Sequence, residues 1–237
     1  MNEDLQFPMR INKYLAHKGL STRRGADTLI ETGKVFINGV RATLGQQIAK
    51  DDTVDVRSKH KEYRYIVYNK PRGVITHSPA EGETDILMRL KEDYNLTGLF
   101  PIGRLDKDSE GLMIMTDDGR ITDRLLNPEH AHERTYEVTV DKPITNQFLR
   151  TIQSGMRIER YFTKPAQVEK TGPARCRITL TEGKKHQIRR MCAGLGYQVQ
   201  QLKRVRILNL AVGDMKPAQY RIIKDAELKE FLKQIGL

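Results

Sequence analysis

The sequence predicts an α+β protein of two domains, the larger built on a mainly antiparallel, mixed sheet flanked by helices. Strand-like segments outnumber helical ones and do not alternate strictly with them, which argues against a doubly wound parallel sheet. A polar segment over residues 57–63 lacks apolar periodicity and reads as a linker. We therefore expect a first domain over residues 1–60, with its core at 9–57, and a second domain over 61–237.

The first domain is predicted to hold two short helices, a hairpin and a closing strand. Ser21 suits the N-cap of the second helix, and Gly33 suits the position after its end. Asn38-Gly39 lies between two short apolar runs and predicts a tight turn, because both residues accept positive φ angles. The closing strand is expected over Asp52–Val56. Each helix should bury one face, at the following positions: Ile11, Leu15 and Ala16, then Ala26, Leu29 and Ile30.

The second domain is predicted from the apolar patterns that follow the linker. Tyr136, Val138 and Val140 alternate with polar residues, as in a strand with one buried face. Gly155 and Gly196 are suited to end two of the helices. Strands are expected at 64–69, 99–102, 112–115, 136–140, 176–180 and 199–210, and helices at 84–94, 122–126, 144–152, 186–195 and 226–235.

The charge balance indicates a polyanionic partner. The chain has a net charge of +11 and an isoelectric point of about 9.6. Residues 10–41 carry seven Lys or Arg against two acids, and residues 184–206 carry seven against none. A solvated surface mixes the two signs more evenly, whereas cations gathered in two places favour contact with phosphates. We therefore expect a nucleic acid as the partner.

Several classes of protein are not expected. No apolar stretch reaches the roughly 18 residues of a membrane-spanning helix, and Met1–Met9 carries acids without the apolar run of a signal peptide. Cys176 and Cys192 are the only cysteines, too few for a disulfide scaffold or a structural zinc site. Phosphate-loop and dinucleotide-binding motifs are absent. We expect a cytoplasmic monomer with free thiols, no metal, no cofactor and no membrane partner.

A run of residues in the first domain resembles a known RNA-binding fold. Arg10-Ile-Asn-Lys-Tyr-Leu-Ala-His-Lys-Gly-Leu-Ser-Thr-Arg-Arg24, followed by Gly33-Lys-Val-Phe-Ile-Asn-Gly39, is similar to the S4 domain. The resemblance implies that the first two helices and the loop after them face structured RNA. For each basic residue alone, a solvated surface charge is the alternative. The implied phosphate contacts are Arg10, Lys13, Arg23, Arg24 and Lys34.

The most informative segment is a charged loop between two apolar strands. It reads Pro101-Ile-Gly-Arg-Leu-Asp-Lys-Asp-Ser-Glu-Gly-Leu-Met-Ile-Met-Thr116. Asp106 lies beside Arg104 and Lys107, and a carboxylate next to fixed cations stays ionised and can act as a nucleophile or a base. The pattern by itself also fits an ordinary surface loop.

Motifs of the second domain resemble the pseudouridine synthases of the S4-bearing ribosomal RNA family. Gly103-Arg-Leu-Asp106, followed by Gly111-Leu112, is similar to their signature and implies that Asp106 is the catalytic aspartate. Arg134-Thr-Tyr-Glu-Val-Thr-Val140 resembles the strand whose tyrosine packs on the target base, which implies that role for Tyr136. A tyrosine of the hydrophobic core is the alternative reading of Tyr136.

A third motif is Leu180-Thr-Glu-Gly-Lys-Lys-His-Gln-Ile-Arg-Arg-Met-Cys192. Its resemblance to the family implies that Arg189 pairs with the catalytic aspartate. Lys185-His186 stands where many relatives have Asn-Arg, and we expect His186 to contact a phosphate or to be exposed rather than to act as an acid or base. Further RNA contacts are expected at Arg104, Lys185 and Arg190.

The resemblance covers residues 9–235 and is strongest to the F-type enzymes, which act on 23S ribosomal RNA, with the B- and E-type enzymes as close alternatives. It implies isomerisation of a specific uridine to pseudouridine after the base leaves its stack, without a cofactor. Two routes stay open for Asp106, attack on C1′ and removal of the C2′ proton. The same chemistry on small-subunit ribosomal RNA or tRNA, and a non-catalytic ribosomal RNA-binding assembly factor, are the remaining alternatives.

Overall fold

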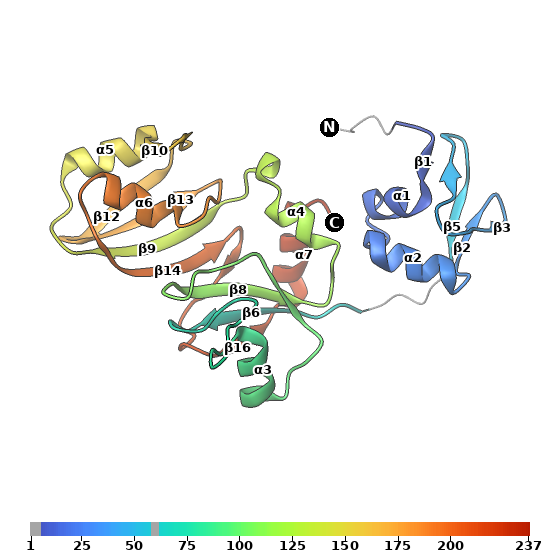
Figure 1. Ribbon diagram of the computed structural model, residues 1–237, viewed down its shortest axis with the longest axis horizontal. Coiled ribbons are helices and arrows are strands. Elements are labelled where there is room, and N and C mark those ends of the chain that lie inside the picture. Colours follow the sequence, from blue (N-terminus) through green and yellow to red (C-terminus); the bar gives the residue numbers. More distant parts are fainter. Residues whose placement is uncertain (1–5, 58–61) are drawn as a thin grey trace. The chain divides into compact units, whose positions relative to one another are not determined.

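The computed structural model describes residues 6–57 and 62–237, which form two compact units (Figure 1). The first unit comprises residues up to 63 together with 118–121, and the second comprises 64–117 and 122–237. Residues 58–61, in the middle of the predicted linker, lie outside the described residues. None of the described helices combines the length and the apolar character needed to cross a bilayer.

The first unit packs two helices against short strands around one small core. Asn38 and Gly39 have φ angles of 50° and 80°, which confirms the predicted turn of the hairpin. The predicted N-cap is wrong by one residue: Thr22, in extended conformation, accepts the N–H of Gly25, and Ser21 is buried. The elements are β1 (Met9–Arg10), α1 (Ile11–His17), α2 (Arg23–Glu31), β2 (Val35–Ile37), β3 (Val40–Arg41), β4 (Gln47–Ile48) and β5 (Val54–Val56).

The second unit is built on a mixed sheet of nine strands, with the order β12-β13-β9-β14-β8-β6-β16 and with β15 and β7 added beside β14 and β8. Only β14 and β8 pair in parallel, so the predicted mainly antiparallel α+β class is confirmed. The strands are β6 (Tyr65–Lys70), β7 (Phe100–Ile102), β8 (Glu110–Thr116), β9 (Arg134–Val140), β12 (Gln167–Gly172), β13 (Arg175–Leu180), β14 (Val199–Ile207), β15 (Leu210–Ala211) and β16 (Tyr220–Ile222).

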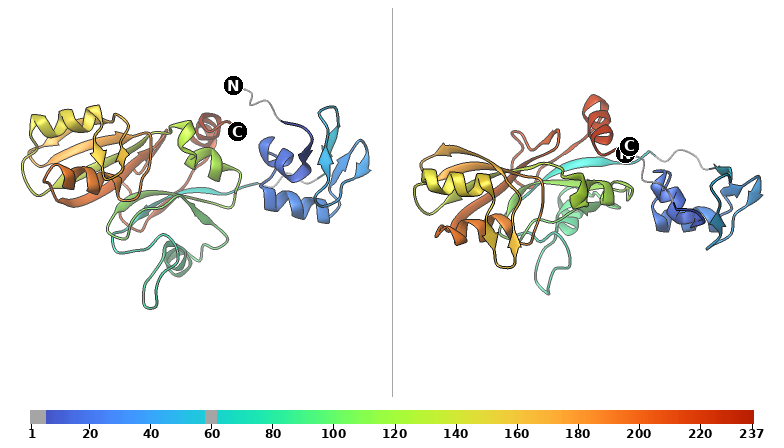
Figure 2. Two further views of the ribbon diagram at one scale, coloured as in Figure 1. Left: turned by 45° about the horizontal axis from the view of Figure 1, so that its top comes forward. Right: turned by 90° about the horizontal axis from the view of Figure 1, so that it is seen from above.

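Helices cover one face of the strands β12, β13, β9 and β14, as Figure 2 shows for α5 and α6. Val138 and Val140 of β9 point into this covered face and share a core with Phe148 of α5 and Met191 of α6. The helical elements are α3 (Ile86–Tyr94), α4 (Ile121–Leu126), the 3-10 turn η1 (Pro128–His130), α5 (Asn146–Ser154), α6 (Gln187–Gly194) and α7 (Asp225–Gln234).

The sequence patterns did not predict the short or polar elements of the second unit. A two-stranded hairpin, β10 (Arg157–Ile158) and β11 (Tyr161–Phe162), follows α5. The edge strand β12 is mostly exposed, so it lacks an apolar signature. The single long strand expected over 199–210 is interrupted at Leu208, whose φ of 51° turns the chain from β14 into β15.

Candidate active site

The loop that carries Asp106 begins and ends at glycines that the fold requires. Gly111, the second residue of β8, has a φ of +108°, and a Cβ at this position would lie 2.2 Å from the backbone oxygen of Arg204. Gly103 also has a positive φ, of +80°. These two conformations favour glycine on backbone grounds. Gly111 is in addition required by the close parallel pairing of β14 with β8, in which Arg204 lies opposite Gly111.

The same loop is held from within the second unit by two buried side chains. Thr76 Oγ1 donates to the Leu105 oxygen at 2.8 Å and accepts the Leu105 N–H at 3.1 Å. The Lys70 ammonium donates to the Lys107 carbonyl oxygen of the loop at 3.5 Å, and to the oxygens of Pro71 and Val74 at 3.0 and 2.6 Å. The backbone of Asp106 is thus fixed on both sides, since the Gly73 N–H also donates to the Lys107 oxygen at 2.8 Å.

Lys70 places a buried positive charge close to the candidate catalytic carboxylate. Its side chain is fully buried at the end of β6. Burial lowers the pKa of Lys70 to about 8, and the negative charge of Asp106 opposes this shift. Sequence reasoning missed Lys70, although a lysine in an otherwise apolar strand just before Pro71 was a signal that could have found it.

Asp106 is held by a histidine. His186 Nδ1 lies 3.0 Å from Asp106 Oδ2, and because a carboxylate only accepts, the ring donates from Nδ1. Their side chains are 43% and 36% exposed, so the carboxylate is in reach of a ligand. The expectation that His186 contacts phosphate or is merely exposed overlooked this bond. His186 adopts a left-handed conformation, with φ of 52°, at the start of α6, and this aims its ring at the loop.

The expected ion pair between Arg189 and Asp106 is not formed. The Arg189 guanidinium instead donates to the Asp108 carbonyl oxygen at 2.9 Å, to Ser109 Oγ at 3.3 Å and to the Val199 oxygen at 3.4 Å. The guanidinium is directed past the Asp106 side chain, because its acceptors lie on Asp108, on Ser109 and on β14. Arg189 therefore holds the backbone of the loop, and its role in catalysis stays a prediction.

A buried carboxylate organises the segment between β13 and α6. Glu182, 4% exposed, accepts the Gln187 side-chain N–H at 2.6 Å, the Lys164 backbone N–H at 3.0 Å and the Tyr161 hydroxyl. Gln187 in turn accepts the Lys184 N–H at 2.9 Å. These bonds fix the loop that presents His186. Sequence reasoning treated Glu182 only as part of a motif, since nothing local indicates that it is buried.

Tyr136 lies between two hydrophobic clusters of the second unit. It is half-buried and packs against the core beneath α5 and α6, and also against the cluster that contains Leu105, the residue before Asp106. The tyrosine thus packs against the same cluster as the residue before Asp106. Burial by itself fits a core tyrosine equally well, so the role of Tyr136 at the target base stays a prediction.

The predicted RNA-binding residues fall into several groups. Arg10, Lys13 and Arg23 line one hollow of about 380 Å³ in the first unit. Arg24 and Lys34 are exposed outside it, as are Arg104 and Lys185 in the second unit. Arg190 differs from these, because its guanidinium forms an ion pair with Glu159.

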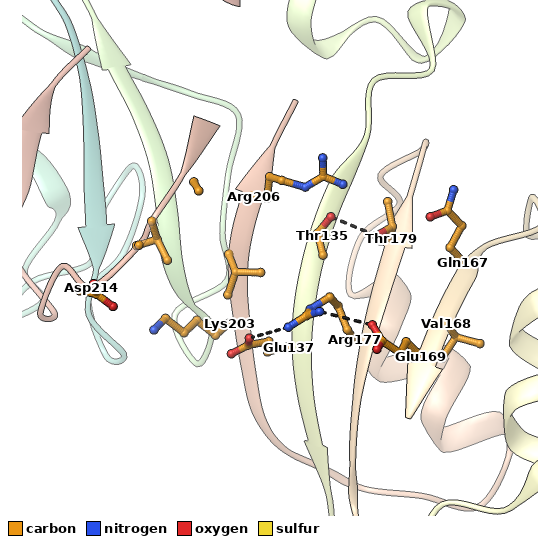
Figure 3. A pocket seen from close by; sticks show the side chains of 14 residues that line it. Thr135, Glu137, Gln167, Val168, Glu169, Arg177, Thr179, Lys203, Arg206 and Asp214 are labelled. Atoms are coloured by element: carbon orange, nitrogen blue, oxygen red, sulfur yellow. Dashed lines mark hydrogen bonds and ion pairs between the residues drawn. The ribbon is translucent and has the colours of Figure 1, made fainter. Parts of the chain in front are cut away.

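A larger hollow, of about 640 Å³, lies on the face of the sheet opposite to α5 and α6 (Figure 3). Its arginines are neutralised: Arg177 lies 3.6 Å from Glu137 and 3.3 Å from Glu169. Asp106 and His186 do not line it. Within residues 6–57 and 62–237, no three His, Cys, Asp or Glu side chains gather so that they could hold a metal ion.

Comparisons with known proteins show the family of both parts of the chain. Residues 64–194 match the family described as RNA pseudouridylate synthase, and residues 9–54 match the S4 domain. The dual-specificity RNA pseudouridine synthase RluF of Escherichia coli is 40% identical over 96% of this chain and 79% of its own length. The ribosomal small subunit pseudouridine synthase A of Vibrio cholerae is 33% identical, over 95% of this chain and all of its own. The crystal structure of a pseudouridylate synthase, 29% identical, superposes with a TM-score of 0.68 and covers 96% of this chain and 99% of its own.

Proposed function

Because the chain belongs to the RNA pseudouridylate synthase family and carries an S4 domain, we propose that it isomerises a specific uridine of 23S ribosomal RNA with Asp106 as its catalytic carboxylate. One observation carries the choice of Asp106. Thr76, Lys70 and Arg189 hold the backbone of the residues beside it, while its carboxylate stays partly exposed and is held by His186. A fixed backbone with an accessible carboxylate is suited to catalysis, because the reacting group is held in position for the substrate.

In the proposed reaction, the Asp106 carboxylate acts on the ribose of the target uridine. Conversion of uridine to pseudouridine breaks the N1–C1′ bond, turns the uracil and forms the C5–C1′ bond, so a proton leaves C5 at the end. Asp106 acts either as the nucleophile at C1′ or as the base that removes the C2′ proton. The hydrogen bond that His186 donates to Oδ2 holds the carboxylate in place for either route, and the buried Lys70 ammonium attracts its negative charge.

The other residues have roles before and after this step. The target base first leaves its stack, at a cost of a few kcal/mol that backbone contacts offset. Arg104, exposed beside Asp106, fills the vacated space or holds the flanking phosphate. Tyr136 stacks on the uracil, and Tyr136 or a water near it takes the C5 proton. Arg189 keeps the loop that carries Asp106 in place through the Asp108 carbonyl.

The choice of RNA rests on the relatives. The likeness to a dual-specificity RNA pseudouridine synthase supports action on more than one RNA, with 23S ribosomal RNA first and tRNA as the second candidate. The likeness to a ribosomal small subunit enzyme keeps small-subunit ribosomal RNA as the alternative target. The hollow that gathers Arg10, Lys13 and Arg23 supports contact of the S4 domain with structured RNA in either case.

The deciding experiment measures tritium release from RNA labelled at uracil C5. The full chain is incubated with 23S ribosomal RNA, small-subunit ribosomal RNA and tRNA, and the modified site is mapped in each. We expect release from 23S ribosomal RNA at one or a few positions. Release from small-subunit RNA alone would replace the target, and no release from any RNA, with binding intact, would make the protein an assembly factor.

A further inference from the structure

The hairpin β10–β11 exposes an aromatic side chain that the core does not use. Ile158 is buried beneath α6 and Tyr161 is half-buried, but Phe162 at the end of the hairpin is 65% exposed. No aromatic side chain in the described residues is more exposed. An exposed phenyl ring contributes little to folding, although aromatic faces are well suited to stack on another ring. The position therefore points to a contact with a partner.

Cations without a carboxylate partner lie on the hairpin that carries this ring and on the loop that contacts the hairpin through Tyr161. Five exposed cations lie in this region: two in the hairpin, one two residues after its end and two in the loop before α6. None of them forms an ion pair within the described part of the chain. Of the nearby acids, Glu159 is paired with Arg190 and Glu182 is buried and fully bonded. The surface therefore attracts phosphates. The five cations are Arg157, Arg160, Lys164, Lys184 and Lys185.

The hairpin and the candidate catalytic carboxylate are fixed to the same loop. Glu182 accepts the hydroxyl of Tyr161 from the hairpin and the side-chain amide of Gln187 from α6. The Lys184 ammonium lies 4.5 Å from the centre of the Tyr161 ring. One residue after Lys185, His186 bonds to Asp106. A molecule held by the hairpin is thus kept at a constant position with respect to Asp106.

We propose that residues 155–164, together with the loop 182–186, form a binding surface for single-stranded RNA, on which Phe162 stacks on an unpaired nucleotide and the five cations hold the phosphates beside it. Extrusion of the target uridine leaves neighbouring bases without a stacking partner, and an aromatic face restores that contact. The proposal rests on the proposed function only in taking RNA as the substrate. It adds a second contact with the same RNA strand, at a distance from Asp106.

The test compares two RNAs of the same length, a stem with an unpaired loop and a fully paired duplex. In the full chain, Phe162→Ala is expected to weaken binding of the loop RNA about tenfold, with the duplex unchanged, as measured by fluorescence anisotropy. Phe162→Trp keeps an aromatic face and should restore the affinity. Ile222→Ala is the matched control, because Ile222 is 61% exposed on the edge strand β16 and should leave both affinities unchanged.

The cations are tested by the salt dependence of the same binding. The triple change Arg157→Gln, Arg160→Gln and Lys164→Gln should reduce the slope of log Kd against log salt by about one for each lost phosphate contact. Equal unfolding midpoints of Phe162→Ala and wild type establish that the variant is folded, as expected for an exposed side chain.

The outcomes separate this surface from the catalytic assignment. Wild-type affinity of Phe162→Ala for the loop RNA, or an equal loss for loop and duplex, overturns the stacking site even if Asp106→Asn is inactive. Conversely, if wild-type protein releases no tritium, the enzymatic proposal is lost, while the difference between loop and duplex still decides whether Phe162 binds single-stranded RNA.

Discussion

The two faces of the strands β12, β13, β9 and β14 differ in what their charges do. On the open face, both arginines that line the large hollow are paired. Arg177 pairs with Glu137 and Glu169, as Figure 3 shows, and Arg206 pairs with Glu133. On the face covered by α5 and α6, the five cations around Phe162 have no carboxylate partner in the described part of the chain. The open face thus combines a large hollow with paired arginines, whereas the covered face combines unpaired cations with an exposed aromatic ring.

On our proposal that RNA binds around Phe162, the size of a hollow is a poor guide to the RNA-binding surface. Ion pairs between exposed side chains already satisfy the arginines of the open face, and a phosphate would have to compete for them. The covered face offers unpaired cations, the exposed ring of Phe162 and the Asp106 carboxylate, which His186 holds. We therefore expect substitutions on the two faces to have unequal effects on RNA.

The largest expected effect is that of Asp106→Asn, which keeps the size of the side chain and removes its charge. Turnover should fall by about 10³-fold or more, with RNA affinity nearly unchanged. Tritium release from labelled RNA measures the turnover. Asp214→Asn is the control, because Asp214 lines the hollow of the open face and should keep wild-type turnover. Comparable loss in both variants would break the comparison of the two faces.

A smaller loss is expected for Arg189→Ala, because the loop after Asp106 loses its hydrogen bonds to the guanidinium. We expect single-turnover rates lower by about 10²-fold, since a misplaced reacting group is costly. Arg177→Ala removes a comparable arginine from the open face and should leave the rate unchanged. If Arg189→Ala turns over as fast as wild type, the anchoring of the loop is not needed for catalysis.

A still smaller loss is expected when the single hydrogen bond from His186 to Asp106 is removed. His186→Ala removes the donor to Asp106 Oδ2 and should slow single turnover about tenfold, as expected for one charge-assisted bond. His186→Asn keeps a donor at this position and should recover part of the rate. A role in phosphate contact alone predicts instead a higher Kd and an unchanged rate at saturating RNA, which would contradict the bond as a positioning device.

The smallest expected effect concerns the stability of the interior beneath the Asp106 loop. The pKa of Lys70 is about 8 in the folded chain and near 10.5 in the unfolded chain. Between these values the unfolded chain binds more protons, so the free energy of unfolding rises with pH, and the cost of the buried charge is fully present below pH 8. In Lys70→Met this rise should be absent.

Urea unfolding of wild type and Lys70→Met at pH 7 and pH 9.5 measures the difference. We expect the wild type to gain on the order of 1 kcal/mol relative to the variant over this interval. Parallel pH profiles of the two proteins would mean that burial does not lower the pKa of Lys70.

Much of the architecture was predictable because it depends on local signals. Asn38-Gly39 specifies its turn through positive φ angles, and the alternation around Val138 specifies a strand with one buried face. The Asp106 motif is contiguous in the sequence and could be found there, although the need for Gly111 comes from the backbone of Arg204 in the neighbouring strand β14. The two cysteines were expected to be free thiols, and both are free and buried.

The hairpin β10–β11 was not predictable in the same way. Its strands have two residues each, too few for a periodic pattern, and their stability comes from Ile158 in the core and from the bond between Tyr161 and Glu182. Without this hairpin in the prediction, Phe162 carried no signal, because exposure is a property of the folded chain and not of a residue type.

By itself the sequence determined the order of the domains, the class of the sheet and the position of the candidate carboxylate, because turn residues, apolar periodicity and a contiguous motif act over short stretches of chain. Only the tertiary structure decided what surrounds that carboxylate. His186 reaches Asp106 across 80 residues, and Arg189 binds the backbone after Asp106 rather than its side chain. Such pairings depend on the angle and register at which α6 and β14 pack beside the loop, and no local pattern encodes these quantities.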